Sequence, residues 1–156
     1  MTTKFWTAKE GDHIRLAMHN EGFDWVIQHG SLTDRISYEP VRNEEGLRRS
    51  LLALVTKKDA NLELWHRSKD HLSVSVQGEH AFVQWTKGAY GDGAPYLTTW
   101  TNVKDSGDDV EFLVGDTPTP IERGRCIPVE TMVRIVLHFF RENELLQEEG
   151  LTWKAV

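Results

Sequence analysis

The sequence contains little cysteine. Its 156 residues include one, Cys126. A single cysteine cannot form an internal disulfide, so a packed core must hold the fold together. A chain of this length can bury most of its surface within one domain. We therefore expect one domain spanning residues 1–156, with Cys126 as a small buried residue at a helix start rather than a catalytic thiol.

Long hydrophobic runs are also missing. No apolar stretch approaches the roughly 18 residues of a membrane-spanning helix. The N-terminus, MTTKFWTAKEG, lacks the apolar segment of a secretion signal. Hydrophobic residues make up 39% of the chain and charged residues 27%, as in ordinary soluble globular proteins. These features predict a cytoplasmic protein.

The common catalytic and metal-binding motifs are absent as well. The chain has seven histidines but no Cys-x-x-Cys, His-Glu-x-x-His or calcium-loop spacing. The loop from Gly88 to Pro95 contains three glycines, yet it lacks the Gly-Lys-Ser/Thr ending of a phosphate-binding loop. No Gly-x-Ser-x-Gly nucleophile turn occurs. We expect a protein that is not an enzyme and that holds neither a metal ion nor a cofactor.

The clearest positive signal lies between Cys126 and the C-terminus. Pro128 suits the first position of a helix, because its missing N–H would have no partner there. An apolar stripe follows at three- and four-residue steps, and Gly150 ends the polar stretch after it. This pattern predicts a helix packed on a sheet and a closing strand over Leu151–Trp153. The stripe consists of Val129, Met132, Val133, Val136, Phe139 and Phe140, and we expect Trp153 to close the same core.

A second helix is predicted from Asn43 to about Lys57. Asn43 followed by two acids is typical of a helix N-cap and first turn. Gly46 inside this helix costs about 1 kcal/mol relative to alanine, which weakens the first turn. The apolar side is formed by Leu47, Leu51, Leu52, Leu54 and Val55.

Period-two alternation dominates the rest of the chain. Within the N-terminal extension, residues 1–40, the alternation predicts a hairpin of His13–His19 with Phe23–Ile27, and a short strand around Ile36–Tyr38. Between Leu62 and Val114 the same pattern predicts four or five antiparallel strands, with a tight turn at Gln77-Gly78. Polar Ser73, Ser75 and Thr98 indicate that one sheet face is solvated while helices cover the other. The predicted class is α+β, with two main helices on one face of an antiparallel sheet.

Acidic residues gather in two segments of a chain whose net charge is −6. One segment runs through Asp105, Asp108, Asp109 and Glu111, and the other spans Glu142–Glu149. Either segment alone is also consistent with an ordinary solvated surface. Tyr90, Asp92 and Trp100 lie in or beside the strand that precedes the first segment, and Tyr and Trp often anchor interfaces. Trp65 is expected in the core.

The C-terminal segment resembles a known family. Ile127-Pro128, Phe139-Phe140 and the closing Leu151-Thr152-Trp153 are similar to the C-terminal signature of the immunity protein family numbered first among bacterial polymorphic toxin systems. The strands before them, including Val83–Trp85 and Val110–Phe112, are similar to that family's central sheet. The family often has Arg-Pro in the turn where this chain has Leu146-Gln147-Glu148.

The resemblance implies a cytoplasmic antidote. Such a protein would bind a co-encoded toxin, commonly a cytosine deaminase acting on double-stranded DNA, and block its active site. We expect steered binding through Tyr90, Asp92, Trp100, Asp105, Asp108, Asp109 and Glu111. Charge reversal at Asp108 and Asp109 should then slow association, and truncation of Tyr90 should speed dissociation. Two alternatives remain open: a small-molecule-binding module, and an adaptor or chaperone that binds an effector without inhibiting it.

Overall fold

The structure is a computed structural model. It describes residues 4–6, 23–29, 36–57, 59–68, 70–87, 96–101, 107–114 and 117–155. The predicted strand His13–His19 and the predicted site residues Tyr90, Asp92 and Asp105 therefore lie outside the described residues.

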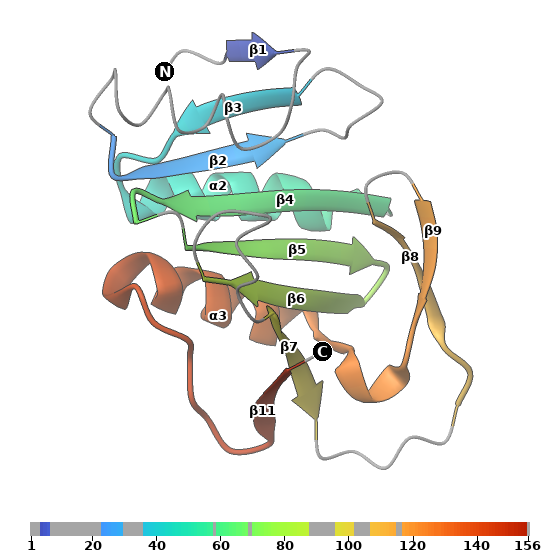
Figure 1. Cartoon of the computed structure of the whole chain (residues 1–156). Helices are drawn as coiled ribbons and strands as arrows, with labels where there is room; N and C mark the ends of the chain where they lie inside the picture. Colours follow the sequence, from blue (N-terminus) through green and yellow to red (C-terminus); the bar gives the residue numbers. More distant parts are fainter. Residues whose placement is uncertain are drawn as a thin grey trace.

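Within these residues the architecture is one large antiparallel sheet with helices on one side (Figure 1). The strands follow the order β1-β3-β2-β4-β5-β6-β7-β11, and β10 pairs with part of β6. The α+β class predicted from the sequence is confirmed. The bounds of these strands are β1 Lys4–Trp6, β2 Trp25–His29, β3 Ile36–Pro40, β4 Asp59–His66, β5 His71–Gln77, β6 His80–Thr86, β7 Tyr96–Thr101, β10 Ile127–Pro128 and β11 Leu151–Ala155.

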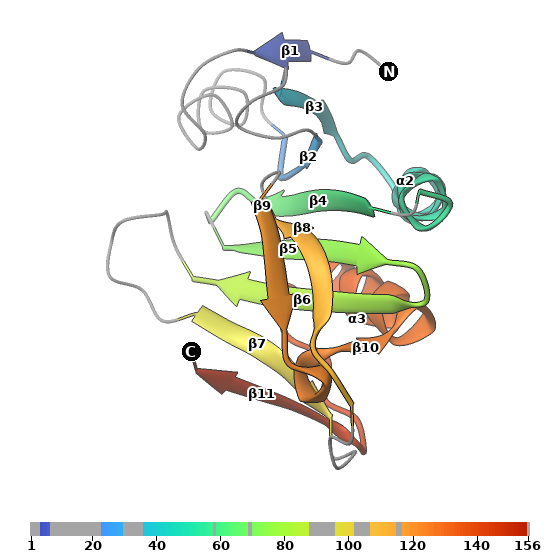
Figure 2. The ribbon, with the colours of Figure 1, turned by 90° about the vertical axis from the view of Figure 1, so that its right-hand side faces the viewer.

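Helices α2 (Glu44–Val55) and α3 (Val129–Glu142) lie on the same face of the sheet (Figure 2). Asn43 caps α2, since its side-chain oxygen accepts a hydrogen bond from the Gly46 N–H at 2.8 Å. Asn143 adopts the left-handed conformation that ends α3, and its N–H bonds to the Phe139 carbonyl at 2.8 Å. Both predicted helices are confirmed to within a few residues.

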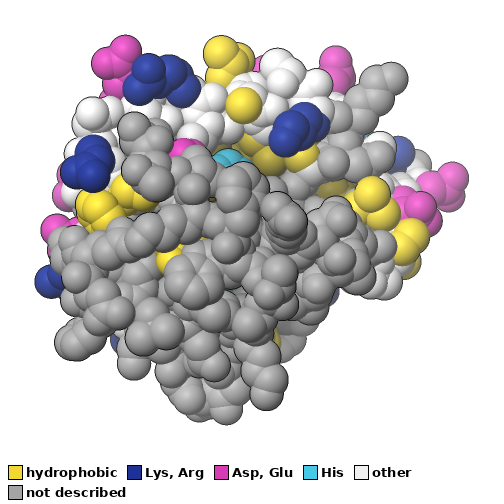
Figure 3. All heavy atoms as spheres, turned by 90° about the horizontal axis from the view of Figure 1, so that it is seen from above, with side chains coloured by type: hydrophobic (Ala, Val, Ile, Leu, Met, Phe, Trp, Pro, Cys, Tyr) yellow, Lys and Arg dark blue, Asp and Glu magenta, His cyan; other side chains and the backbone are white. Residues whose placement is uncertain are grey.

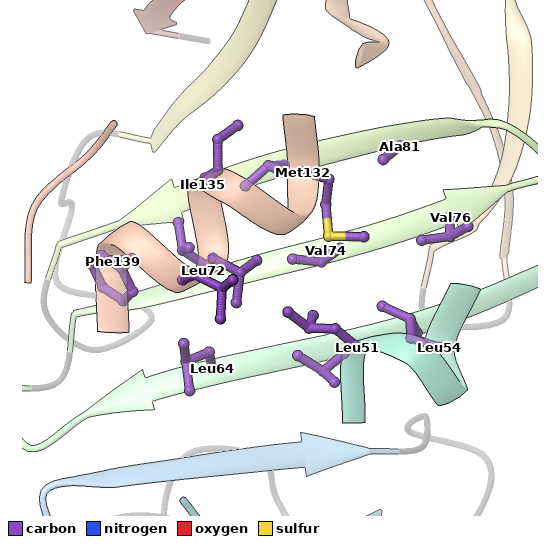
Figure 4. Packing of buried hydrophobic residues seen from close by; sticks show 14 of the residues in the cluster. Leu51, Leu54, Leu64, Leu72, Val74, Val76, Ala81, Met132, Ile135 and Phe139 are labelled. Atoms are coloured by element: carbon purple, nitrogen blue, oxygen red, sulfur yellow. The ribbon is translucent and has the colours of Figure 1, made fainter. Parts of the chain in front are cut away.

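The main core lies between the two helices and the sheet. Met132, Ile135 and Phe139 of α3 point toward the alternate residues of β4, β5 and β6 that face the helices (Figure 4). Leu51 and Leu54 of α2 lie against the same sheet face. The expected burial of Met132, Val136 and Phe139 is confirmed.

Some details of the helix prediction are wrong. Pro128 is the N-cap of α3 and also pairs with β6, so the helix begins one residue later than predicted. Phe140 is only partly buried. Trp153 does pack against the core, as predicted, and its indole N–H donates to the Leu146 carbonyl at 3.0 Å. Leu52 is 64% exposed, because its place on α2 faces away from the sheet.

The face of the sheet opposite α2 and α3, which we name the outer face, differs most from the prediction. Strand β8 (Val110–Val114) does not extend the meander but pairs with β9 (Thr117–Ile121) in a separate two-stranded sheet. This hairpin crosses the outer side of the sheet (Figure 2). The Asn61 amide of β4 donates to the Leu113 carbonyl of β8, and the Asn61 side-chain oxygen accepts from the Ser75 hydroxyl. Phe112 of the hairpin is fully buried with Phe82 of β6. The outer face is therefore not a uniformly solvated surface.

The polar residues that suggested a solvated face are mostly buried. Ser75 and Thr98 are 5% and 0% exposed, although their side chains belong to the outer face. Trp65 is buried on that face with Val26 and Tyr38, as a core role predicted.

The positions of one turn and one strand also differ from those predicted. The tight turn after β5 consists of Gly78 and Glu79, one residue later than predicted, and Gly78 has the positive φ of +61° that such a turn requires. Strand β2 does form, but it lies between β3 and β4 in the sheet.

Candidate partner-binding surface

Trp100 is the predicted site residue whose surroundings are best defined. Its side chain lies on the outer face of β7, between two cations. The Lys154 ammonium nitrogen is 4.5 Å from the ring centroid, and the Arg125 guanidinium carbon is 5.1 Å from it. Such contacts over an indole ring are attractive. Trp100 is therefore packed against two cationic side chains and remains only partly buried.

The short 3₁₀ helix η1 (Arg123–Arg125) fixes one side of this tryptophan. The Thr99 hydroxyl donates to the Arg125 carbonyl at 2.9 Å, and the Thr101 hydroxyl donates to the Gly124 carbonyl at 3.4 Å. Gly124 allows the close approach, because a Cβ there would lie 3.3 Å from the Trp100 ring. The sequence thus places a glycine where the indole ring needs the space.

Three of the predicted acids follow Gly107, a residue that contacts η1. Asp108, Asp109 and Glu111 are all exposed, at the start of β8. Gly107, directly before them, lies against the Arg123 side chain, where a Cβ would overlap the guanidinium. Arg123 of η1 thus lies against Gly107, and Gly124 of η1 lies against Trp100, so η1 links the start of the acidic segment to the tryptophan.

We define the Trp100 surface as this group of side chains together with the exposed part of β7 and β11. Tyr96 adds a second aromatic ring on the same face of β7, 37% exposed. Thr152 pairs with Trp100 across the strands and is exposed. The members of the surface are Tyr96, Trp100, Asp108, Asp109, Glu111, Arg125, Thr152 and Lys154.

The sequence analysis missed four members of this surface: Tyr96, Arg125, Thr152 and Lys154. Tyr96 could have been included, because it shares the period-two face of Trp100. Arg125 and Lys154 could not, because nothing in the sequence shows that they meet at one tryptophan. Their presence changes the expected character of the surface, since cations flank its central aromatic ring while acids lie at its rim.

The described residues at the β1 edge of the sheet do not form a surface of one charge sign (Figure 3). In the view from the β1 edge, basic and acidic side chains lie close together among the described residues (Figure 3). Within the described parts of the chain, no group of three or more His, Cys, Asp or Glu side chains could hold a metal ion. Across those same parts, neither helix combines the length and hydropathy of a membrane span.

Comparison with known proteins identifies the family. Curated proteins give no match. Residues 34–155 match the family described as Immunity protein Imm1. The matched range begins just before β3 and ends with β11, so it includes the helices, the β8–β9 hairpin and every described member of the Trp100 surface. The chain belongs to the Imm1 immunity protein family.

Proposed function

We propose that this protein binds the toxin encoded beside it, a nucleic-acid deaminase, and neutralises it by covering its active site in the cytoplasm. Family membership over residues 34–155 carries the proposal, because immunity proteins act as non-enzymatic inhibitors of toxins. The toxin's chemistry and the covered active site are the parts that need experiment.

Electrostatics support a nucleic-acid-acting partner. Enzymes that grip phosphates carry lysine and arginine around their clefts. A partner of net charge −6 is attracted to such a cleft, and complementary fields raise association rates above the unsteered range of about 10⁵–10⁶ M⁻¹s⁻¹. Asp108, Asp109 and Glu111 are exposed, so their charges act over the distance that separates approaching partners.

The Trp100 surface offers the combination that tight interfaces use. A partly exposed indole ring packed against two cations provides an anchor, and charges of both signs around it provide selectivity. Arg125 and Lys154 would repel a toxin whose cleft is basic at the point opposite Trp100. The acids at the rim would attract basic residues at the border of the cleft. This mixture favours recognition of one cognate toxin over attraction to any basic protein.

Inhibition assays with the co-encoded toxin test the proposal. Deamination of double-stranded DNA by the purified toxin domain should fall to background at one equivalent of this protein. Trp100→Ala should weaken inhibition by at least about tenfold, as for a central interface anchor. The control variant Trp153→Phe changes a tryptophan on the opposite face of β11 and should leave inhibition unchanged.

Two other outcomes correspond to the alternatives. A complex in which the toxin stays fully active would identify an adaptor or chaperone. A small-molecule-binding module would bind its ligand in a pocket lined by the sheet's tryptophans. A cavity at α2 is lined instead by residues of β2, of β3, of the segment that joins β3 to α2, and of the first turns of that helix.

A further inference from the structure

A cavity lies under the first turns of α2, beside β2 and β3. In the strand order of the sheet this position is far from β7 and β11, so the cavity is separate from the Trp100 surface. Its volume is about 180 Å³, enough for a group of a few heavy atoms. The apolar part of its lining comes from Ile27, Pro40 and Val41.

Gly46 keeps this cavity open. The residue lies inside α2, where glycine is unfavourable and no positive φ requires it. A Cβ at this position would lie 3.4 Å from the Asn43 side-chain oxygen and 4.0 Å from a guanidinium nitrogen of Arg49. A side chain would thus enter the space between the helix and the mouth of the cavity.

Two arginines at the cavity have no carboxylate partner among the described residues. Arg42 lies over the Phe23 ring at 4.9 Å, and Arg49 lies over Gly46. Five of the other six described arginines form ion pairs at 3.9 Å or less, and Arg123 is the exception. The paired arginines are Arg48, Arg67, Arg125, Arg134 and Arg141.

The polar wall of the cavity is already organised. Oε1 of Glu39 accepts a hydrogen bond from the Ser50 hydroxyl at 3.2 Å and lies 3.4 Å from Nε2 of His29. The Asn43 oxygen is occupied by the Gly46 N–H, which leaves the Asn43 amide nitrogen available as a donor. The charges of Arg42 and Arg49 exceed that of Glu39 by one.

We propose that this cavity binds a carboxylate carried on a short apolar stem. The two guanidinium groups and the Asn43 amide would donate to the carboxylate, and Ile27, Pro40 and Val41 would contact the stem. A single negative charge balances the excess cation, whereas a phosphate dianion would leave a net negative charge beside Glu39. The carboxylate is either a small free acid or the C-terminus of a peptide chain, since both have this chemistry.

Nuclear magnetic resonance titrations of the ¹⁵N-labelled full chain test the site. The probes are sodium propionate, inorganic phosphate, and the tripeptide Ala-Ala-Val with a free or an amidated C-terminus, all at constant ionic strength. We expect propionate to shift the Gly46 and Arg49 amide signals saturably. Tighter binding of the free tripeptide, with no binding of its amide, would identify a chain terminus as the ligand, and equal binding of propionate would identify a free acid.

Three variants separate a binding site from a general charge effect. Arg49→Ala should weaken propionate binding about tenfold, the factor expected for one charge-assisted hydrogen bond. Arg48→Ala removes the same charge from the adjacent helical position, where the side chain pairs with Glu44, and should not weaken binding. Gly46→Ala should weaken binding although the folded protein becomes more stable.

The proposal is overturned if neither propionate nor the tripeptide gives saturable shifts. It is equally overturned if Arg48→Ala weakens binding as much as Arg49→Ala, or if phosphate binds more tightly than propionate. None of these results depends on toxin inhibition, so this proposal and the proposed function fail separately.

Discussion

Arg141 in the last turn of α3 bonds through its Nε to the Glu44 carboxylate in the first turn of α2. The Glu44 carboxylate also accepts hydrogen bonds from the Arg48 guanidinium at 3.3 Å, so one carboxylate pairs with two arginines. The pair joins the C-terminal end of one helix to the N-terminal end of the other, and each charge suits the dipole of its own helix end. Helices distant in the sequence are thereby fixed side by side over the core.

This pairing predicts an acid-dependent loss of stability. The pKa of Glu44 lies below its ordinary value of 4.5, chiefly because the Arg141 guanidinium bonds to the carboxylate. A lowered folded-state pKa contributes stability that is fully present above the unfolded-state value and is lost as the pH falls through the folded-state value. The stability difference between the native protein and Glu44→Gln should therefore be constant above about pH 5 and shrink below pH 4.5.

Urea unfolding of both proteins between pH 3 and 7 measures this difference. Glu45→Gln is the matched control, because it removes the same charge from the same helical turn without removing a described ion pair. A Glu44→Gln effect no larger than that of Glu45→Gln at neutral pH would show that the pair contributes nothing.

His66 predicts a second pH effect in a higher range. Its ring lies 4.5 Å from that of Trp25, and burial lowers its pKa below the ordinary 6.5 despite the attraction of Asp24 and Asp70. The unfolded chain then takes up the proton first, so stability is fully present above pH 6.5 and declines as the pH falls below it. Proton titration of the His66 ring signals should give a midpoint below 6.5. A midpoint above that value would contradict the burial of the ring.

The neighbouring residues Phe139 and Phe140 should differ in their contribution to stability. Phe139 is fully buried, so Phe139→Ala should lower the free energy of unfolding by about 3–5 kcal/mol. Phe140 is partly exposed beside Trp25, so Phe140→Ala should cost only about 1–2 kcal/mol. Chemical unfolding of the two variants compares them directly, and equal losses would contradict the orientation of α3.

Gly46→Ala should stabilise the protein. The position is helical, its φ is not positive, and an added Cβ meets no atom closer than 3.4 Å. Alanine should raise the free energy of unfolding by about 0.5–1 kcal/mol, measurable as a higher urea midpoint. A lower midpoint would mean that the added methyl group strains the Asn43 cap.

Local patterns in the sequence predicted where the helices and strands occur better than they predicted which strands pair with each other. The stripe on α3 and the Asn43 cap of α2 are properties of adjacent turns, so the sequence shows them directly. The pairing of Val110–Val114 is not local, and alternation alone does not say which strand lies beside it. Strand β9 was missed because it contains Pro118 and Pro120. Prolines are tolerated there because the hairpin leaves one edge of β9 without a strand partner among the described residues.

The candidate surface shows the same limit. The sequence pointed to Trp100, Asp108, Asp109 and Glu111 through composition and position in a strand. It could not show that Lys154 and Arg125 approach one ring, because those contacts depend on the pairing of β11 with β7 and on the position of η1. The partner-binding roles of all these residues, and those of Tyr90, Asp92 and Asp105, remain predictions.

Steered binding through the Trp100 surface predicts different kinetic effects for charge and for the aromatic anchor. Reversing both charges with Asp108→Lys and Asp109→Lys should slow association with the toxin by about tenfold at low salt and flatten its salt dependence. Trp100→Ala should mainly speed dissociation. An unchanged association rate for the charge-reversed variant would mark the acids as ordinary solvated residues and direct attention to Glu142–Glu149.

The most direct test of the central claim is the activity of the co-encoded toxin on double-stranded DNA, titrated with this protein. The account predicts that deamination falls in proportion to added protein and reaches background at one equivalent, and that excess DNA substrate slows the onset of inhibition because both compete for one cleft. Full toxin activity in a stoichiometric complex, or no complex at all, would contradict it.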